Sequence, residues 1–309
     1  MLLSPKDSEL FAMAKAGELP NLPAFSSLAD DALAPSLAVW GLTDDGSLQA
    51  AKAFDALRHA FVPLTSDAPI RVLTAQMPQV VLDSLGLANH VGSIPSEAVI
   101  NNLQDAVTLL GQIGDDYRQS VINGIDTLVM VKVRAGAAEG TVLTSITIPT
   151  FPMASFFSAN AQRHLAPAAL TDAPDIAVLS ENLLHESVHQ NVNITILERD
   201  IFPDSFDPQT ARKIEIPWRQ TAKETRNRFW EIDRCLHAFA VYVGVLPYRV
   251  AIAQDAGQTP STKDAFAASI TQAEKSLRFL HHALDDVRDS FAPDGQALLS
   301  ELQAKNPFQ

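Results

Sequence analysis

The run His185-Glu186-Ser187-Val188-His189 constrains the fold more than any other segment, because it matches the pattern H-E-x-x-H inside an apolar stretch. Residues four apart lie on one face of an α-helix, so both imidazoles can reach one metal ion. Glu186 would project beside them, toward a water next to the metal. We expect a buried helix capped by Asp175 that runs to about Asn191. The alternative is a pair of ordinary helix histidines.

The surrounding pattern predicts an α+β fold that is predominantly helical. Residues 126–133 and 141–148 are rich in Val, Ile and Leu and flank a glycine-containing turn at 135–140, which predicts a β-hairpin. The first 120 residues have mainly helical spacing, clearest at 99–110. The H-E-x-x-H segment would then be a zincin-like metal-binding helix that follows a small hairpin or sheet.

Two further helices are expected after the metal-binding helix. The first begins near Arg226 and ends at Gly244 and Pro247, and it would carry the third metal ligand. The second covers about 260–290 and has an apolar seam at alternating spacings of four and three. That seam consists of Phe266, Ile270, Ala273, Leu277, Leu280, Leu284 and Val287.

The chain has no internal repeat and no composition shift that would mark a linker, so residues 1–309 are predicted to form a single domain. Residues 1–120 would be its mainly helical N-terminal part. Residues 121–309 would contain the hairpin, the H-E-x-x-H helix, the third-ligand helix and the long C-terminal helix.

Composition excludes several classes of function. The chain is 47% hydrophobic, and Lys+Arg 23 against Asp+Glu 36 give a net charge of -13, which disfavours binding to nucleic acid. The start lacks a signal-peptide pattern, and no run of about 18 apolar residues predicts a membrane span. Cys235 has no partner in the chain and is expected to be a small buried hydrophobe. A reducing cytoplasm is the predicted compartment.

Two histidines on one helix need a third ligand to hold a metal tightly. The metzincin continuation would require Gly and His where this chain has Val192 and Thr195. A gluzincin-like site would take a Glu from a following helix. Glu224 and Glu231 are available, but neither lies in the sequence context of that group.

His237 is the preferred third ligand. It lies in the nearly all-apolar run 236–242, where an imidazole without a partner would be costly to bury. The alternative is a core histidine with a hydrogen bond to a carbonyl or carboxylate group. Asp233, one helical turn earlier, could instead ligate the metal or orient the imidazole.

Three segments together resemble one family: His185 to His189, then Pro217-Trp218-Arg219, then the run 236–242. They are similar to the HExxH-motif proteins of bacterial gene clusters for ribosomally synthesised, post-translationally modified peptides. Residues 10–17 resemble the opening helix of that family. The resemblance implies an Fe(II)- and 2-oxoglutarate-dependent hydroxylase that acts on the β-carbon of a side chain in a precursor peptide.

Such an oxygenase needs a cation for the distal carboxylate of 2-oxoglutarate, which a guanidinium binds with two hydrogen bonds. Arg219 and Arg226 are the favoured candidates, and the alternative is a helix face on which arginines pair with nearby carboxylates. Trp218, with Trp230, could form an apolar wall against the cosubstrate or the peptide, or lie in the core.

The usual oxygenase triad is two histidines and one carboxylate, so a set of three histidines would depart from it. Glu186 would then orient a ligand instead of acting as a base. One rival function is a zinc metallopeptidase that uses Glu186 as the general base. The other is a non-catalytic peptide-binding protein.

Overall fold

The computed structural model describes residues 49–306, except 51, 55, 67, 139–141, 150, 167–168 and 220–227. The expected helix at 10–17 and the candidates Glu224 and Arg226 lie outside the described residues. The expected fold class is confirmed in its main terms, because 56% of the described residues are helical and 15% are in strands.

The chain divides into two compact units. The sheet unit comprises Met1–Leu165 and Leu170–Glu198, and the helical unit comprises Ala166–Ala169 and Arg199–Gln309. The predicted metal-binding helix belongs to the sheet unit, and the predicted third-ligand helix belongs to the helical unit.

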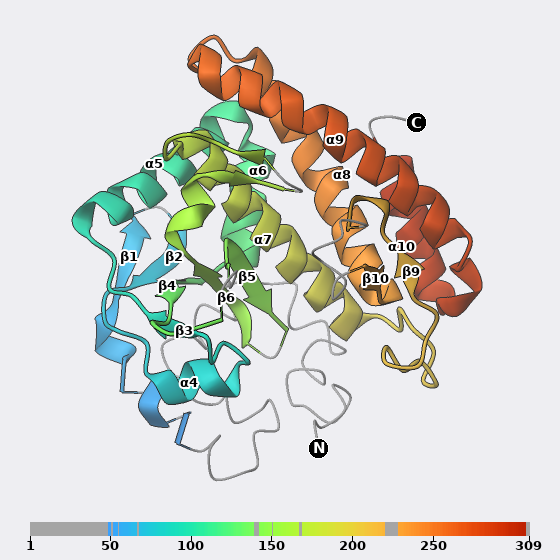
Figure 1. Ribbon diagram of the computed structural model, residues 1–309, viewed down its shortest axis with the longest axis horizontal. Helices are drawn as coiled ribbons and strands as arrows, with labels where there is room; N and C mark the ends of the chain where they lie inside the picture. Colours follow the sequence, from blue (N-terminus) through green and yellow to red (C-terminus); the bar gives the residue numbers. More distant parts are fainter. Residues whose placement is uncertain are drawn as a thin grey trace. The chain divides into compact units, whose positions relative to one another are not determined.

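In its described residues the sheet unit combines a mixed β-sheet with helices that include α4, α5, α6 and α7 (Figure 1). Its main strands are β1 (Phe61–Thr65), β2 (Ala68–Leu73), β3 (His90–Gly92), β4 (Thr127–Val133), β5 (Ser145–Ile148) and β6 (Phe151–Phe157). The named helices are α4 (Gln79–Ser84), α5 (Glu97–Ile113), α6 (Asp115–Gly124) and α7 (Ile176–Glu198). Short elements are η2 (Arg58–Ala60), η3 (Ala159–Gln162) and β7 (His164–Leu165). The two-residue strand β8 (Ala169–Leu170) has one residue in each unit.

The sheet has the strand order β1-β2-β4-β6-β5, and β3 pairs with the end of β4. The pairs β2–β4 and β4–β6 are parallel, whereas β1–β2 and β5–β6 are antiparallel. In the described residues β5 is therefore an antiparallel edge strand. Helix α7 follows in the chain and contacts both β5 and β6.

The predicted hairpin of residues 126–133 with 141–148 is wrong, because β6 lies between β4 and β5. Pro152 is tolerated because β6 bulges there: the register to β5 shifts between Thr147 and Ile148, and Met153 has φ 60°. Phe156 and Phe157 are both fully buried, so this central strand lacks the alternation that predicts strands.

The mainly helical expectation for residues 1–120 misses a second hairpin, β1 with β2. Its strands face different environments, because β1 is at the edge of the described sheet and β2 is inside it. Pro63 lies on the edge strand, where a missing backbone donor costs little.

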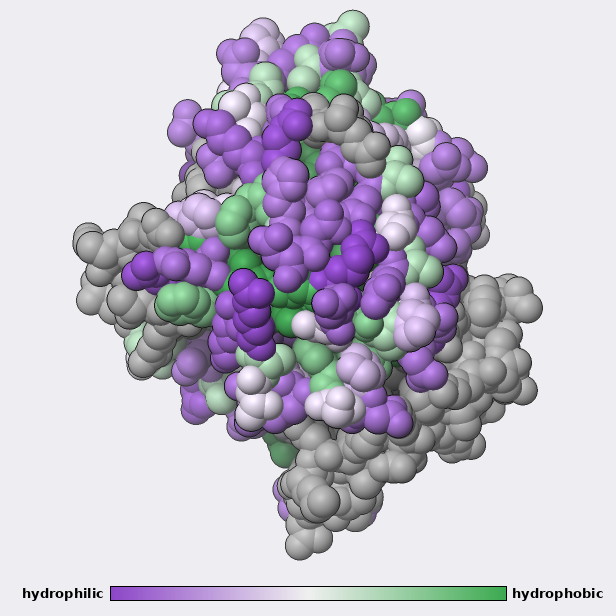
Figure 2. Space-filling model, turned by 90° about the vertical axis from the view of Figure 1, so that its right-hand side faces the viewer, coloured by the Kyte–Doolittle hydropathy of each residue, from purple (hydrophilic) through white to green (hydrophobic). Residues whose placement is uncertain are grey.

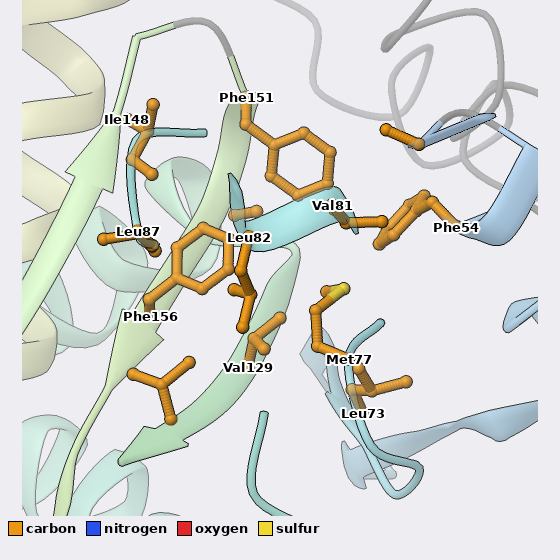
Figure 3. Close-up of a cluster of buried hydrophobic side chains, with 13 residues drawn as sticks. Phe54, Leu73, Met77, Val81, Leu82, Leu87, Val129, Ile148, Phe151 and Phe156 are labelled. Atoms are coloured by element: carbon orange, nitrogen blue, oxygen red, sulfur yellow. The ribbon is translucent and has the colours of Figure 1, made fainter. Parts of the chain in front are cut away.

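Hydrophobic side chains cover one face of the sheet (Figure 3). Val129 of β4 and Phe156 of β6 lie in this cluster with Val81 and Leu82 of α4. Because successive strand residues point to opposite faces, Ser155 of β6 faces the other side, where α7 packs. The labelled members are Phe54, Leu73, Met77, Val81, Leu82, Leu87, Val129, Ile148, Phe151 and Phe156.

The helical unit is built on two long helices that pack side by side, α8 (Ile232–Gln254) and α9 (Pro260–Asp285) (Figure 1). The predicted apolar seam is confirmed in α9 at Phe266, Ala273, Leu277, Leu280 and Leu284, which are fully buried. Ile270 is only half-buried, and Val287 is buried but lies beyond the end of α9. The remaining elements are β9 (Ile214–Glu215), η4 (Pro217–Arg219), β10 (Phe229–Trp230), η6 (Arg288–Ser290) and α10 (Pro293–Ala304).

Helix α8 does not end at Gly244 and Pro247 as expected but continues to Gln254. Proline removes one backbone donor, yet burial of Val245, Leu246 and Tyr248 on both sides of it favours continuation of the helix.

By length and composition α8 could cross a membrane, but 67% of its most apolar window is buried inside the protein. This burial is consistent with the core helix of a soluble protein. The face of the molecule in Figure 2 is mostly hydrophilic, with smaller hydrophobic areas between the hydrophilic residues.

Candidate metal site

Helix α7 carries the H-E-x-x-H segment as predicted and is held in place at its start. Asp175 accepts hydrogen bonds from the backbone N–H groups of Ala177 (2.7 Å) and Val178 (3.4 Å), which confirms the predicted cap. Asn182 donates to the carbonyl groups of Ala161 and His164, 2.9 Å each. These bonds fix the helix against the preceding loop, although it extends to Glu198 and not only to Asn191.

His185 and His189 face each other along one side of α7. Their Nε2 atoms are 3.2 Å apart, and their ring centroids are 4.9 Å apart. With metal–nitrogen bonds of about 2.1 Å, this separation corresponds to an angle of about 100° at a shared metal ion. That angle lies between the octahedral and tetrahedral values, so the two imidazoles fit two neighbouring coordination positions.

Glu186 points away from solvent and toward the edge strand. The residue is 2% exposed, and its carboxyl group accepts hydrogen bonds from the side chains of Ser145 and Thr147 and from the Thr147 backbone. Its Oε2 atom is buried without a hydrogen-bond partner. Burial raises the pKa of Glu186 to about 7, and the hydrogen bonds from β5 lower it only in part.

Small and amide side chains anchor α7 to α6 and to the sheet. Ser187 lies 3.2 Å from Ser120 of α6, Oγ to Oγ, and Gln190 donates to the carbonyl of Ala154 on β6 at 3.0 Å. Gly124 of α6 approaches Ser187 so closely that a Cβ atom there would lie 2.8 Å from the Ser187 carbonyl oxygen. These contacts hold the two histidines through the backbone of their own helix.

The predicted third ligand and its neighbour lie in the first turns of α8. Burial lowers the pKa of His237 to about 4 and raises the pKa of Asp233. The Oδ1 atom of Asp233 is buried without a hydrogen-bond partner. His237 belongs to the helical unit, and in the described part of the chain no three His, Cys, Asp or Glu side chains form a metal-binding group. The structure thus brings two predicted ligands together, and His237 stays a prediction.

Trp218 and Arg219 lie in η4, within an aromatic cluster of the helical unit. The Trp218 ring packs edge-on against Trp230 (centroids 5.9 Å apart) and Phe279 (5.6 Å). The Cζ atom of Arg219 is 6.0 Å from the centroid of the Trp230 ring. Trp218 therefore packs with other aromatic rings, and Arg219 is held beside one of them.

Two site residues have partners that their sequence context does not predict. Ser145 and Thr147 bind Glu186 from a strand about forty positions earlier in the chain, and Arg234 joins Arg219 at Trp230, with its Cζ atom 4.5 Å from the ring centroid. No spacing rule links such pairs. The only signal for Arg234 was its place in an arginine-rich stretch of an acidic chain.

No protein-family model matches the chain, and no curated protein matches it significantly.

Proposed function

We propose that this protein is an Fe(II)- and 2-oxoglutarate-dependent hydroxylase that acts on the β-carbon of a side chain in a ribosomally made precursor peptide. The observation that carries the metal site is the pair of Nε2 atoms of His185 and His189, 3.2 Å apart on one helix. The position of α7 after the sheet and against β5 supports a zincin-like metal-binding helix. His237 is the proposed third ligand.

The donor set suits iron. Three neutral imidazoles on one side of the ion would leave positions for the two oxygens of the keto acid and for dioxygen. When bound, iron with 2-oxoglutarate and dioxygen supplies the oxidising power to replace a C–H bond by C–OH. The residues of this chain bind and orient the metal, and Arg219 or Arg226 would bind the distal carboxylate of the cosubstrate.

The environment of Glu186 favours the oxygenase over the peptidase. A hydrolytic base must contact the attacking water beside the metal. The Glu186 carboxyl group is instead nearly inaccessible and bound to Ser145 and Thr147 of β5. In this position Glu186 fixes α7 against the edge strand. It thereby helps to position His185, the residue directly before it.

A zinc metallopeptidase is the second candidate, and one observation favours it. The pKa of Glu186 is raised to about 7, which suits a general base that works near neutral pH. In that case Glu186→Gln would abolish turnover while the protein keeps its metal.

The two chemistries are separated by an anaerobic titration of the metal-free protein with Fe(II) and then 2-oxoglutarate. We expect the weak visible charge-transfer band of a chelated keto acid. It should be absent in His185→Ala and His189→Ala and unchanged in the control His59→Ala, an exposed histidine of the same unit. Absence of the band, with zinc retained through dialysis and peptide cleavage lost in Glu186→Gln, would establish the peptidase instead.

Failure to retain any metal, with no gain in melting temperature from Fe(II), Mn(II) or Zn(II), would leave the non-catalytic peptide-binding protein. A peptide substrate made on ribosomes agrees with the proposed cytoplasmic location. We propose neither nucleic acid nor a membrane as a partner.

A further inference from the structure

His90 of β3 is almost completely buried in the sheet unit, and its ring has no hydrogen-bond partner among the described residues. The residue is 8% exposed, and both ring nitrogens, Nδ1 and Nε2, are buried without a hydrogen bond. A buried polar group without a partner costs free energy that an apolar side chain of similar size would not cost. His90 therefore does not stabilise the fold in the way that a hydrogen-bonded core histidine does.

The pairing of β3 turns the His90 ring toward α4. In the antiparallel β3–β4 ladder, directly opposite residues share a face of the sheet, and His90 lies opposite Val133. Gly92, on the same face, lies opposite Val131 of the hydrophobic cluster. A Cβ atom at Gly92 would lie 2.4 Å from the backbone nitrogen of Met77, in the connection that leads to α4. The ring thus lies where β3 packs against α4 and this connection.

This interface is built from short elements. β3 has three residues and α4 has six, and α4 begins without a side-chain cap. Gln79 of α4 donates from Nε2 to the His90 carbonyl at 3.0 Å, and the His90 N–H donates to the Leu87 carbonyl at 2.9 Å. Short elements with few buried contacts open at a lower free energy than the core of a domain. This region can therefore open while the central strands stay paired.

In the described residues, no neighbouring charge compensates a proton on the ring. Opposite β3, the two β4 residues on this face are valines, whereas Lys132 lies on the other face and Arg134 is exposed. On α4 the only charged residue is Asp83, which is exposed and accepts a hydrogen bond from Gln79 at 2.9 Å. The connections before and after α4 contain no titratable residue. Burial lowers the pKa of His90, and no charge contributes to this shift.

We propose that His90 is a pH-sensitive switch: the neutral ring keeps β3 and α4 closed against the sheet, and the protonated ring opens them. A positive ring has no partner in the closed interface and must reach water to be solvated. Opening would uncover Met77, Val81 and Leu82, which are buried in the hydrophobic cluster (Figure 3). The switch is independent of the proposed hydroxylase, because this cluster covers the face of the sheet away from α7.

The direction of the switch follows from where the proton binds. The open form has an exposed imidazole with the ordinary pKa of 6.5, and burial in the closed form lowers that pKa. Lower pH therefore favours the open form. Between pH 7.5 and pH 5, the ratio of open to closed form should rise by up to about thirtyfold, which is the limit for a ring that stays neutral when closed.

Hydrogen exchange of the full chain, measured by mass spectrometry at pH 7.5 and pH 5 and corrected for the intrinsic rate, tests this switch. We expect the amides of residues 79–92 to lose about tenfold or more of their protection at pH 5, while those of β6 and α7 keep theirs. In His90→Phe, whose ring cannot be protonated, residues 79–92 should be equally protected at both pH values. His90→Leu repeats the comparison with a smaller apolar side chain.

The matched control is His59→Ala, which removes an exposed histidine of the same unit and should respond to pH like the native protein. The same loss of protection at pH 5 in the native protein and in both His90 variants would overturn the switch. So would unchanged protection of the native protein, or a loss spread evenly over the sheet unit. NMR titration of the His90 ring in the native protein needs no variant, and a pKa of 6.5 or higher there would also contradict the proposal.

Discussion

Glu186 has an ionisable side chain that is almost completely buried. Because ionisation of a buried carboxyl group is unfavourable, Glu186 lowers the stability of the folded protein when it is charged. The carboxyl group is 2% exposed, and only hydrogen bonds from β5 compensate for its removal from water. Below the ordinary carboxyl pKa the group is neutral in both folded and unfolded protein. As the pH rises, the unfolded chain ionises first, so the folded state loses relative stability up to a pH of about 7.

Glu186→Gln should remove this pH dependence in the metal-free protein. A rise of the pKa from 4.5 to about 7 corresponds to about 3 kcal/mol of stability lost between pH 4.5 and pH 8. Denaturant unfolding in the presence of a chelator, at pH 5 and pH 8, should show a smaller difference for Glu186→Gln than for the native protein. The control Glu301→Gln, at an exposed position of α10, should behave like the native protein. The same difference in all three proteins would contradict the burial argument.

Cys235 offers a second test at the same scale. Its thiol is fully buried in α8, and burial raises its pKa to about 12, as expected for a small buried hydrophobe. A thiol reagent at pH 8 should react with the folded protein only at the rate of unfolding and with one equivalent in denaturant. Rapid reaction of the folded protein would show that this part of α8 opens readily.

At the scale of elements, α7 depends on close contact with α6 as well as with the sheet. Gly124 ends α6 against Ser187, which lies between the two histidines in the sequence of α7. A side chain at this point must push the helices apart. The geometry of His185 and His189 is therefore sensitive to a residue that touches neither of them.

Gly124→Ala should destabilise the protein by about 1–3 kcal/mol, because the added Cβ would lie 2.8–2.9 Å from atoms of Ser187. Urea unfolding measures this loss, and metal titration should show weaker binding. Gly257→Ala is the control, since its Cβ would meet nothing nearer than 3.4 Å. Equal free energies of unfolding for both variants would mean that α6 can move away from α7 without loss of stability.

Periodic elements could be predicted from the sequence, and the partners they meet could not. The Asp175 cap and the α9 seam follow from local spacing. Strand β6 was missed because it is buried on both faces, and the end of α8 was misplaced because packing outweighed Pro247. The facing of His185 and His189 followed from their spacing, whereas the contact of Glu186 with Thr147 depends on how distant strands pair.

At the scale of the whole molecule, metal binding should couple to folding stability. A metal held by His185 and His189 binds the folded chain and not the unfolded one, so it adds stability that grows with the logarithm of the metal concentration above the dissociation constant. Loss of His185 should therefore remove the gain in stability, and loss of His237, the proposed third ligand, tests that proposal.

Addition of Mn(II), as a redox-stable substitute for Fe(II), should raise the melting temperature of the metal-free protein by a few degrees at 100 times its dissociation constant. The gain should disappear in His185→Ala and shrink in His237→Ala, while His59→Ala should keep it. Scanning calorimetry measures all four proteins. A full gain in His237→Ala would exclude His237 as a ligand.

The position of β6 also affects how the chain folds as it leaves the ribosome. β6 is the last of the main sheet strands to be synthesised, yet it lies between β4 and β5. Until residue 157 has emerged, β4 has an open parallel edge and β5 has no described neighbour to pair with. The nascent sheet thus stays incomplete through most of its synthesis and closes just before α7, which carries both histidines, is made.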